Sequence, residues 1–204
     1  MTEFFALASY LLVMIITPGP NNIMLTASGA NFGVRRTLPH MFGILVGNGV
    51  QFFCCSLLMA SAAGVLAPVR LPLAVAGCLY LLWMALKLAR AGSPGQREVG
   101  QPVRFIGGML FQCVNPKAWI IVINATVLFT PAGSQWLAAL TLTATAFCIG
   151  VPSLLCWVWG GEGLRRWLGN PRALAVFNLS MAGLLAGTAL WLLYDELLRG
   201  PALA

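Results

Sequence analysis

An apolar stretch in the middle of the chain, residues 105–129, contains Asn115-Pro116-Lys117 at its centre and no other charged residue. A stretch of this kind is typical of a membrane-spanning helix, which needs about 20 mostly apolar residues. Lys117 lies about 18 Å from either end at the rise of an α-helix. A lysine at that depth cannot reach water and costs at least about 2.5 kcal/mol. Other parts of the protein must therefore surround Lys117.

The rest of the chain is also too apolar for a water-soluble protein. Hydrophobic residues make up 59% of the 204 residues, charged residues only 8%, and the mean hydropathy is +0.86. A soluble core could not hide so much apolar surface, and helices satisfy backbone polar groups in lipid without a partner strand. The sequence predicts an all-α polytopic membrane protein with six spans, at residues 4–27, 41–67, 71–86, 105–129, 136–159 and 173–194.

The beginning of the chain and its cysteines have simple interpretations. Met1-Thr2-Glu3 contains no positive charge, and the first apolar segment is longer than the core of a signal peptide, so we expect a retained membrane helix.

All six cysteines fall inside apolar stretches without metal-ligand spacing and are expected to be small buried hydrophobes. The sequence therefore indicates no metal and no cofactor.

The net charge of +7 follows the expected membrane topology. The first, third and fifth connections contain nine of the twelve cations, namely Arg35, Arg36, Lys87, Arg90, Arg97, Arg104, Arg165, Arg166 and Arg172. Arg70 and Arg199 lie on the other side of the membrane. The positive-inside rule makes the nine-cation side cytoplasmic, which places both termini outside, in the periplasm if the host membrane is a bacterial inner membrane. Topology accounts for the charge, and we expect no nucleic-acid partner.

The sequence predicts one transmembrane domain, residues 1–204, with two related halves. The first half covers about residues 1–90, a cytoplasmic loop residues 91–104, and the second half residues 105–204. Three helices per half would insert the second half upside down, as a 3+3 inverted repeat. The leading helix of each half is interrupted at similar depth, by Thr17-Pro18-Gly19-Pro20-Asn21-Asn22 and by Asn115-Pro116-Lys117. Matched interruptions are typical of carriers with a site near the membrane midplane.

The two interruptions provide the groups that a zwitterion needs. Pro18 and Pro20 free the carbonyls of Met14 and Ile16, and Pro116 frees that of Gln112. A new helix beginning near Asn21 and the Lys117 amine would bind a carboxylate, while freed carbonyls and asparagine oxygens would bind an ammonium. The expected substrate-binding residues are Pro18, Gly19, Pro20, Asn21, Asn22, Gln112, Asn115, Pro116 and Lys117. Alternatively, the prolines only kink the helices and the polar groups bond to neighbouring helices.

Other polar residues are candidates for the transport path and for proton coupling. Asn48 and Gln51 should face the bundle interior because they are costly in lipid, and Trp119 lies two positions past Lys117, so all three are path-lining candidates. No Asp or Glu lies at membrane depth, which leaves Lys117 and His40 as candidates for proton coupling. Electrogenic uniport of a zwitterion stays open. Gly43 and Gly47 have the small-x-x-x-small spacing that predicts close helix packing.

Four motifs resemble the LysE-type amino-acid exporter family, particularly its homoserine/threonine-resistance branch. In order and spacing they are Thr17 to Asn22, the Gly-x-Arg-Arg segment Gly33 to Arg36, Gly43 with Gly47, and Asn115-Pro116-Lys117-Ala118. The likeness covers nearly the whole chain. It implies export of amino acids or close derivatives from the cytoplasm, by proton antiport. The sequence also resembles the cysteine and O-acetylserine exporters of that family, and the substrate stays open.

Two other classes of function would need residues that this chain lacks at membrane depth. With one histidine and no acid at membrane depth, the chain cannot assemble a Ser-His-Asp site or an H-E-x-x-H metal site, so an enzyme is not expected. An exporter of inorganic cations, or of another small solute on the same fold, is the alternative. Cations would require carboxylates or thiolates at the midplane, where this chain has a lysine. A homo-oligomer is compatible with the sequence.

Overall fold

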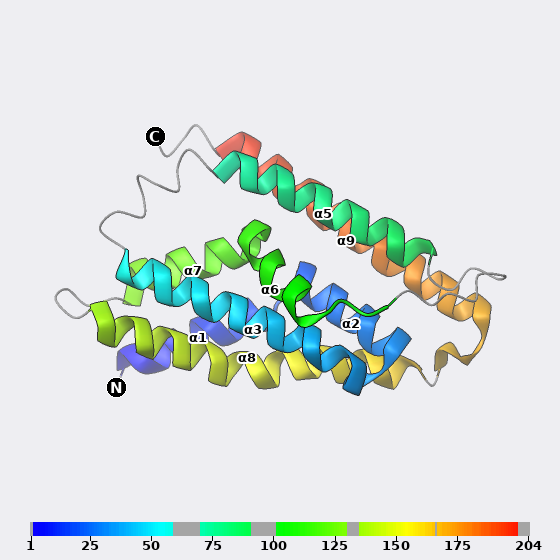
Figure 1. Cartoon of the computed structure of the whole chain (residues 1–204), viewed down its shortest axis with the longest axis horizontal. Coiled ribbons are helices and arrows are strands. Elements are labelled where there is room, and N and C mark those ends of the chain that lie inside the picture. Colours follow the sequence, from blue (N-terminus) through cyan, green and yellow to red (C-terminus); the bar gives the residue numbers. More distant parts are fainter. Residues whose placement is uncertain (1, 59–69, 91–100, 130–134, 166, 200–204) are drawn as a thin grey trace.

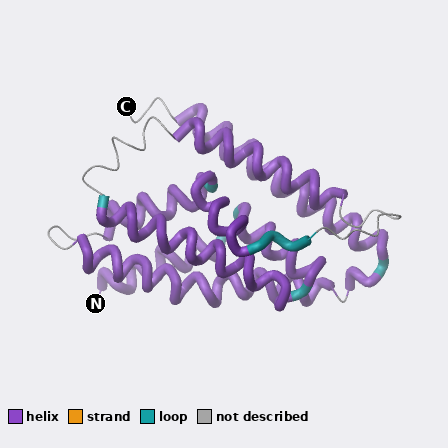
Figure 2. The backbone as a smooth tube through the Cα atoms, in the orientation of Figure 1, coloured by secondary structure: helices purple, strands orange, loops and turns teal. Residues whose placement is uncertain are grey.

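The computed structural model describes residues 2–58, 70–90, 101–129, 135–165 and 167–199, and every element in these ranges is a helix (Figures 1 and 2). The predicted all-α class is therefore confirmed for the described residues. In chain order the elements are α1 (Thr2–Ile16), α2 (Pro20–Phe32), α3 (Val34–Leu57), α5 (Arg70–Arg90), α6 (Phe105–Val114), α7 (Pro116–Phe129), α8 (Gln135–Arg165), the 3-10 turn η2 (Trp167–Gly169) and α9 (Pro171–Arg199).

The first expected span consists of two helices, α1 and α2, which meet at a bend of 56°. Gly19 between them has an extended backbone, with φ −169° and ψ −179°, and Pro20 opens α2. Proline suits the first position of a helix because the N–H it lacks has no partner there. Pro18 and Pro20 both lack the amide hydrogen that a continuous helix would need. The predicted interruption of this span is confirmed.

The fourth expected span is interrupted in the same manner. Helices α6 and α7 meet at a bend of 69°, and Asn115 alone separates them. Asn115 has φ −85° and ψ 105°, because the residue before a proline is pushed away from the helical region. Its carbonyl then accepts the first bond of α7, from the Trp119 N–H at 3.2 Å. The second predicted interruption is also confirmed.

The first connection differs from the expectation. Instead of a loop that holds Arg35 and Arg36, a single residue, Gly33, separates α2 from α3, and both arginines lie in the first turn of α3. Gly33 has φ +81°, a conformation that glycine adopts without strain. Helix α2 also continues beyond residue 27 to Phe32. The predicted boundaries were wrong here because hydropathy marks the apolar part of a helix, whereas the helix itself continues through polar residues.

The described helices support a polytopic membrane protein. Three of them, α3, α8 and the part Pro171–Tyr194 of α9, are long and apolar enough to cross a membrane, and the two bent pairs raise this number to five. Helix α5 is a continuous helix of 21 residues over the expected third segment. The end of the expected second segment, residues 59–67, and most of the expected cytoplasmic loop, residues 91–100, lie outside the described residues.

The helices form two groups (Figure 1). Helices α5 and α9 pack along each other as a pair, and the larger group contains α1 to α3 and α6 to α8. Helix α1 begins and α9 ends toward the left of Figure 1, whereas α3 begins and α5 and α8 end toward the right. The right end therefore carries a set of cations, Arg35, Arg36, Lys87, Arg90 and Arg165. We call it the cationic end.

Glycines bring two helix pairs into direct backbone contact. In the α2–α8 pair, a Cβ atom on Gly29 would collide with the carbonyl of Val158, and one on Gly161 with the carbonyl of Thr26. In the α3–α6 pair, a Cβ on Gly43 would collide with the carbonyl of Phe105. Gly47 makes a similar but slightly wider contact, with its Cβ position 2.7 Å from the Met109 carbonyl oxygen. The close packing predicted for Gly43 and Gly47 is confirmed.

Candidate functional site

At the first break, protein side chains hold the backbone carbonyls that the helix leaves unpaired. Asn22 is buried and donates its amide N–H groups to the carbonyls of Ile15 at 2.9 Å and Thr17 at 2.8 Å. The indole N–H of Trp157 on α8 donates to the carbonyl of Ile16 at 3.2 Å. The carbonyl of Ile16, which the sequence offered to a substrate ammonium, therefore has a partner within the protein.

Lys117 connects the two breaks. Its Nζ donates to the carbonyl of Thr17 at 2.6 Å and to that of Pro18 at 3.3 Å. The stem of the lysine packs against Gly19, where a Cβ atom would lie 2.7 Å from Cδ and 2.9 Å from Nζ. The amine of one half is thus seated on the interrupted backbone of the other, beside the N-terminus of α2.

Gln112 forms a second connection between the breaks and is completely buried. Its amide exchanges hydrogen bonds with Asn21, at 2.9 and 3.2 Å, and also donates to the carbonyl of Gly108 at 2.9 Å. Its Oε1 accepts a further bond from Asn115 at 3.2 Å. Its backbone carbonyl, freed by Pro116, accepts the amide N–H of Gln51 at 2.8 Å. Gln112 therefore holds the breaks in register and has no free group for a ligand.

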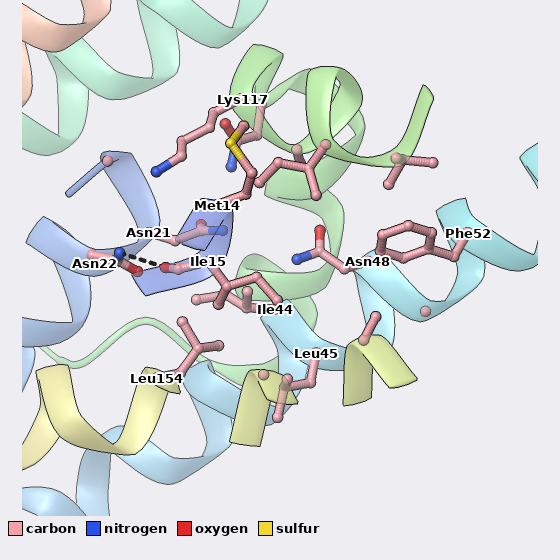
Figure 3. A pocket seen from close by; sticks show the side chains of 18 of the residues that line it. Met14, Ile15, Asn21, Asn22, Ile44, Leu45, Asn48, Phe52, Lys117 and Leu154 are labelled. Atoms are coloured by element: carbon pink, nitrogen blue, oxygen red, sulfur yellow. Dashed lines mark hydrogen bonds between the residues drawn. The ribbon is translucent and has the colours of Figure 1, made fainter. Parts of the chain in front are cut away.

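A cavity of about 40 Å³ lies between the two breaks and helices α3 and α8 (Figure 3). One water needs roughly 10–15 Å³ by this measure, so the cavity has room for about three waters. Its polar lining comes from both breaks and from α3, and its apolar lining from α1, α3, α7 and α8. The lining residues are Met14, Ile15, Gly19, Pro20, Asn21, Asn22, Ile44, Leu45, Asn48, Gly49, Phe52, Asn115, Lys117, Ala118, Ile121, Val122, Ala146, Phe147, Gly150 and Leu154.

The cavity contains most, though not all, of the residues expected to bind a substrate. Those that line it are Gly19, Pro20, Asn21, Asn22, Asn115 and Lys117, together with the path candidate Asn48. The others support the breaks or lie elsewhere, and they are Pro18, Gln112, Pro116, Gln51, Trp119 and His40. Trp119 donates its indole N–H to the carbonyl of Cys113 at 2.8 Å. His40 is buried where α3 meets Gly108 of α6.

Sequence reasoning missed the contribution of α8. Ala146, Phe147, Gly150 and Leu154 form one wall of the cavity, and each of them is an ordinary residue in an apolar helix. Pro152 and the adjacent Ser153, inside α8, are local signals near them, but no asparagine or lysine accompanies them as at the two breaks. Such a wall becomes visible only when the helices are assembled.

The described lining of the cavity carries a positive charge and no negative charge. Lys117 is the one charged residue in the lining given above, which contains no carboxylate. The amide oxygens of Asn48 and Asn115 are buried and accept no hydrogen bond from any described residue. Within the described part of the chain, no group of three or more His, Cys, Asp or Glu side chains could hold a metal ion. The cavity therefore combines one cation with unpaired neutral acceptors.

Comparison with known proteins places this arrangement in a family. The family model described as "LysE type translocator" matches residues 12–196. The chain belongs to the LysE family. The resemblance seen in the sequence motifs is thereby confirmed, and the protein is a transporter rather than an enzyme.

Several curated members of the LysE family match the chain over most of its length. A cysteine/O-acetylserine efflux protein of Klebsiella pneumoniae is 31% identical over 168 residues, which cover 81% of this chain and 85% of the relative. The proteins of the same name in Escherichia coli K12 and Salmonella paratyphi A are each 27% identical, over 81% and 78% of this chain and 85% and 82% of the relatives. No solved structure matches the chain significantly.

Proposed function

We propose that this chain exports small amino acids, or close derivatives of them, from the cytoplasm through the cavity between its two helix breaks. The observation that carries the proposal is the meeting of the Lys117 amine and the N-terminus of α2 beside that cavity. Both favour a carboxylate. Membership of the LysE family and the efflux activity named for its relatives support the same conclusion.

The charge of the lining narrows the substrate to amino acids with uncharged side chains. A basic amino acid would bring a second cation into a cavity whose described lining already contains Lys117 and no carboxylate. An isolated charge of that kind is costly in a low-dielectric site. The apolar wall from Ile44, Leu45 and Leu154 suits a short, weakly polar side chain. Substrates of the kind named for the relatives, cysteine and O-acetylserine, meet both conditions.

The transport cycle is proposed to use two inverted halves in a bacterial inner membrane. Each half contributes one bent pair, α1–α2 and α6–α7, and the two pairs contact each other through Lys117 and Gln112. The positive-inside rule would place the cationic end in the cytoplasm, so that α1 begins and α9 ends outside. A site between the leading helices of two inverted halves is the arrangement used for alternating access.

Proton antiport is proposed as the source of energy. It needs a group at membrane depth that can gain and lose a proton, and Lys117 and His40 are the candidates. Lys117 lies at the cavity and holds two backbone carbonyls. His40 is completely buried, and neither ring nitrogen has a hydrogen-bond partner among the described residues. Export of inorganic cations is the alternative, and the position of Lys117 argues against it because its charge would repel them.

The proposal is tested by export from cells loaded with a panel of amino acids. We expect wild-type protein to increase the efflux of small neutral amino acids but not of lysine or arginine. Lys117→Ala should reduce that efflux at least about tenfold, since hydrogen bonds to charged groups contribute about 1.5–3 kcal/mol. Lys87→Ala is a matched control because Lys87 lies 3.8 Å above the ring of Trp83, outside the cavity.

Membrane insertion is measured in parallel for each variant, so that lost efflux can be separated from lost protein. Equal efflux from wild-type protein and from correctly inserted Lys117→Ala would remove the cavity from the transport path. Efflux of inorganic cations without any efflux of amino acids would favour the alternative.

A further inference from the structure

Two asparagine side chains at the cavity have an amide oxygen that accepts no hydrogen bond from the described residues. Asn115 is only 2% exposed, and its Nδ2 is engaged with Oε1 of Gln112, while its Oδ1 has no partner among the described residues. Oδ1 of Asn48, on α3, is likewise buried without a partner among them. Buried polar atoms in proteins are nearly always hydrogen-bonded, and leaving one unpaired is costly. Both asparagines line the same cavity, and their two unpaired oxygens indicate a place beside it for a donor that is not part of the protein.

The polar side chains at the first break are already engaged within the protein. Asn22 gives its amide N–H groups to the backbone of the first break, and Asn21 exchanges hydrogen bonds with Gln112. Lys117 reaches toward that same break, while the Asn48 side chain extends from α3 toward the middle of the cavity (Figure 3). The residues around the cavity thus offer a cation in one place and two asparagines with unpaired oxygens in another.

We propose that the amide oxygens of Asn48 and Asn115 bind the α-ammonium group of the substrate, while the Lys117 amine binds its carboxylate. This assignment rests on the proposed function and adds the residues that recognise the amino group. An ammonium carries three donors and no acceptor, so it complements a pair of free carbonyl-type oxygens. The backbone carbonyls of the first break already accept hydrogen bonds from Asn22, Trp157 and Lys117. They are therefore not free to bind the ammonium, and the two asparagine oxygens are.

The choice of neutral acceptors suits a carrier. A carboxylate in the cavity would pair with Lys117 and would close the site when it is empty. Two amide oxygens cannot form such an ion pair, so the site stays available for a ligand of no net charge. They also hold a cation less strongly than a carboxylate does, which favours release after each transport step.

The test compares two compounds that differ only in the amino group, L-cysteine and 3-mercaptopropionate. Each is used under reducing conditions to inhibit the uptake of labelled cysteine into proteoliposomes that contain the full chain. Wild-type protein should require far less cysteine than 3-mercaptopropionate for half-inhibition. Asn48→Leu and Asn115→Leu keep the approximate shape of the side chain and remove the acceptor. Each should reduce this preference about tenfold or more, as expected for a lost hydrogen bond to a charged group.

The inhibition by 3-mercaptopropionate should stay unchanged in both variants, because that compound has no ammonium to lose. Asn124→Leu is the matched control, since Asn124 is an exposed asparagine of α7 outside the cavity. Asn48→Ala and Asn115→Ala replace the leucine variants if those do not insert. A preference that is unchanged in inserted variants overturns the assignment and leaves the proposed function intact. Wild-type protein that takes up no cysteine and exports no other amino acid overturns the proposed function, and the assignment with it.

Discussion

At the scale of single residues, Gly19 shows how the two halves depend on each other. Its backbone is extended, a conformation open to any residue, so the need for glycine at this position comes from contact rather than from backbone geometry. The atoms that a Cβ would meet are Cδ and Nζ of Lys117, at 2.7 and 2.9 Å. They belong to the far end of a flexible side chain, which can move at little cost. A larger residue at this position should therefore displace the amine without unfolding the protein.

We predict that Gly19→Ala retains the thermal stability of the protein but weakens substrate binding during transport. The added methyl group would move the Lys117 amine away from the carbonyls of Thr17 and Pro18. We expect the concentration for half-maximal transport to rise about tenfold, the effect of losing roughly 1.4 kcal/mol of binding free energy. Transport kinetics in proteoliposomes and the melting temperature in detergent measure the two effects. Gly183→Ala in α9, where a Cβ meets nothing within 4 Å, should change neither.

The sequence allowed the residues around the breaks to be predicted, but not their partners. Asn21, Asn22, Asn115 and Lys117 stood out because polar groups are costly in an apolar segment, and all four line the cavity. Gln112 stood out for the same reason, yet its hydrogen bonds all go to protein groups. Whether a buried polar group meets a ligand or a neighbouring helix depends on long-range packing, and local sequence does not encode that choice.

At the scale of helices, the α2–α8 crossing depends on two glycines that face opposite backbones. Because the atoms in the way are carbonyl groups of Val158 and Thr26, no side-chain rotation could make room for a methyl group. The helices themselves would have to separate. Gly160, next to Gly161 in α8, offers a direct comparison, since its Cβ would meet nothing within 4 Å.

We predict opposite effects on stability from these two neighbours. Gly161→Ala should lower the free energy of unfolding by about 1–3 kcal/mol, the usual cost of overpacking. Gly160→Ala should leave it unchanged or raise it by up to about 1 kcal/mol, because alanine favours the helix over glycine. Thermal unfolding of the two variants in the same detergent measures the difference. Equal melting temperatures would mean that α2 and α8 do not touch at Gly161 in the membrane.

The interruptions and the helix pairing differ in how far the sequence reveals them. Proline acts locally, by the hydrogen bond it cannot make, so both breaks were predictable from Pro18, Pro20 and Pro116 alone. The pairing of α2 with α8 joins residues more than a hundred positions apart. The spacing of Gly43 and Gly47 did indicate a close contact, but it could not identify α6 as the partner.

At the scale of the whole molecule, the distribution of charge implies an orientation. The described structure places Arg35, Arg36, Lys87, Arg90 and Arg165 at the cationic end, away from the start of α1 and the end of α9 (Figure 1). Segments rich in lysine and arginine stay in the cytoplasm during insertion. The sorting of cations to one side was visible in the sequence, and the described helices gather five of them at one end.

We predict that a reporter fused after α9 lies outside the cytoplasm. A fusion to alkaline phosphatase, which is active only after export, should be active there, and a fusion to green fluorescent protein should be dark. Fusions at Arg90, at the end of α5, should give the reverse result. If both fusions gave the same pattern, the number of spans between Arg90 and the end of α9 would be even. That result would contradict three spans in the second half, and therefore the inverted halves.

The glycine crossings also determine which helices must separate to open the cationic side of the cavity. The backbone contacts at Gly29, Gly161 and Gly43 all involve the helix segments on the cationic side of the two breaks. At these points backbone meets backbone, and beside them side chains of α2, α3 and α8 pack in one apolar cluster that includes Leu25, Ile44 and Val158. In the proposed orientation these contacts lie on the cytoplasmic side of the cavity. Alternating access from that side would therefore require α2 and α8 to part at Gly29 and Gly161 in every transport cycle.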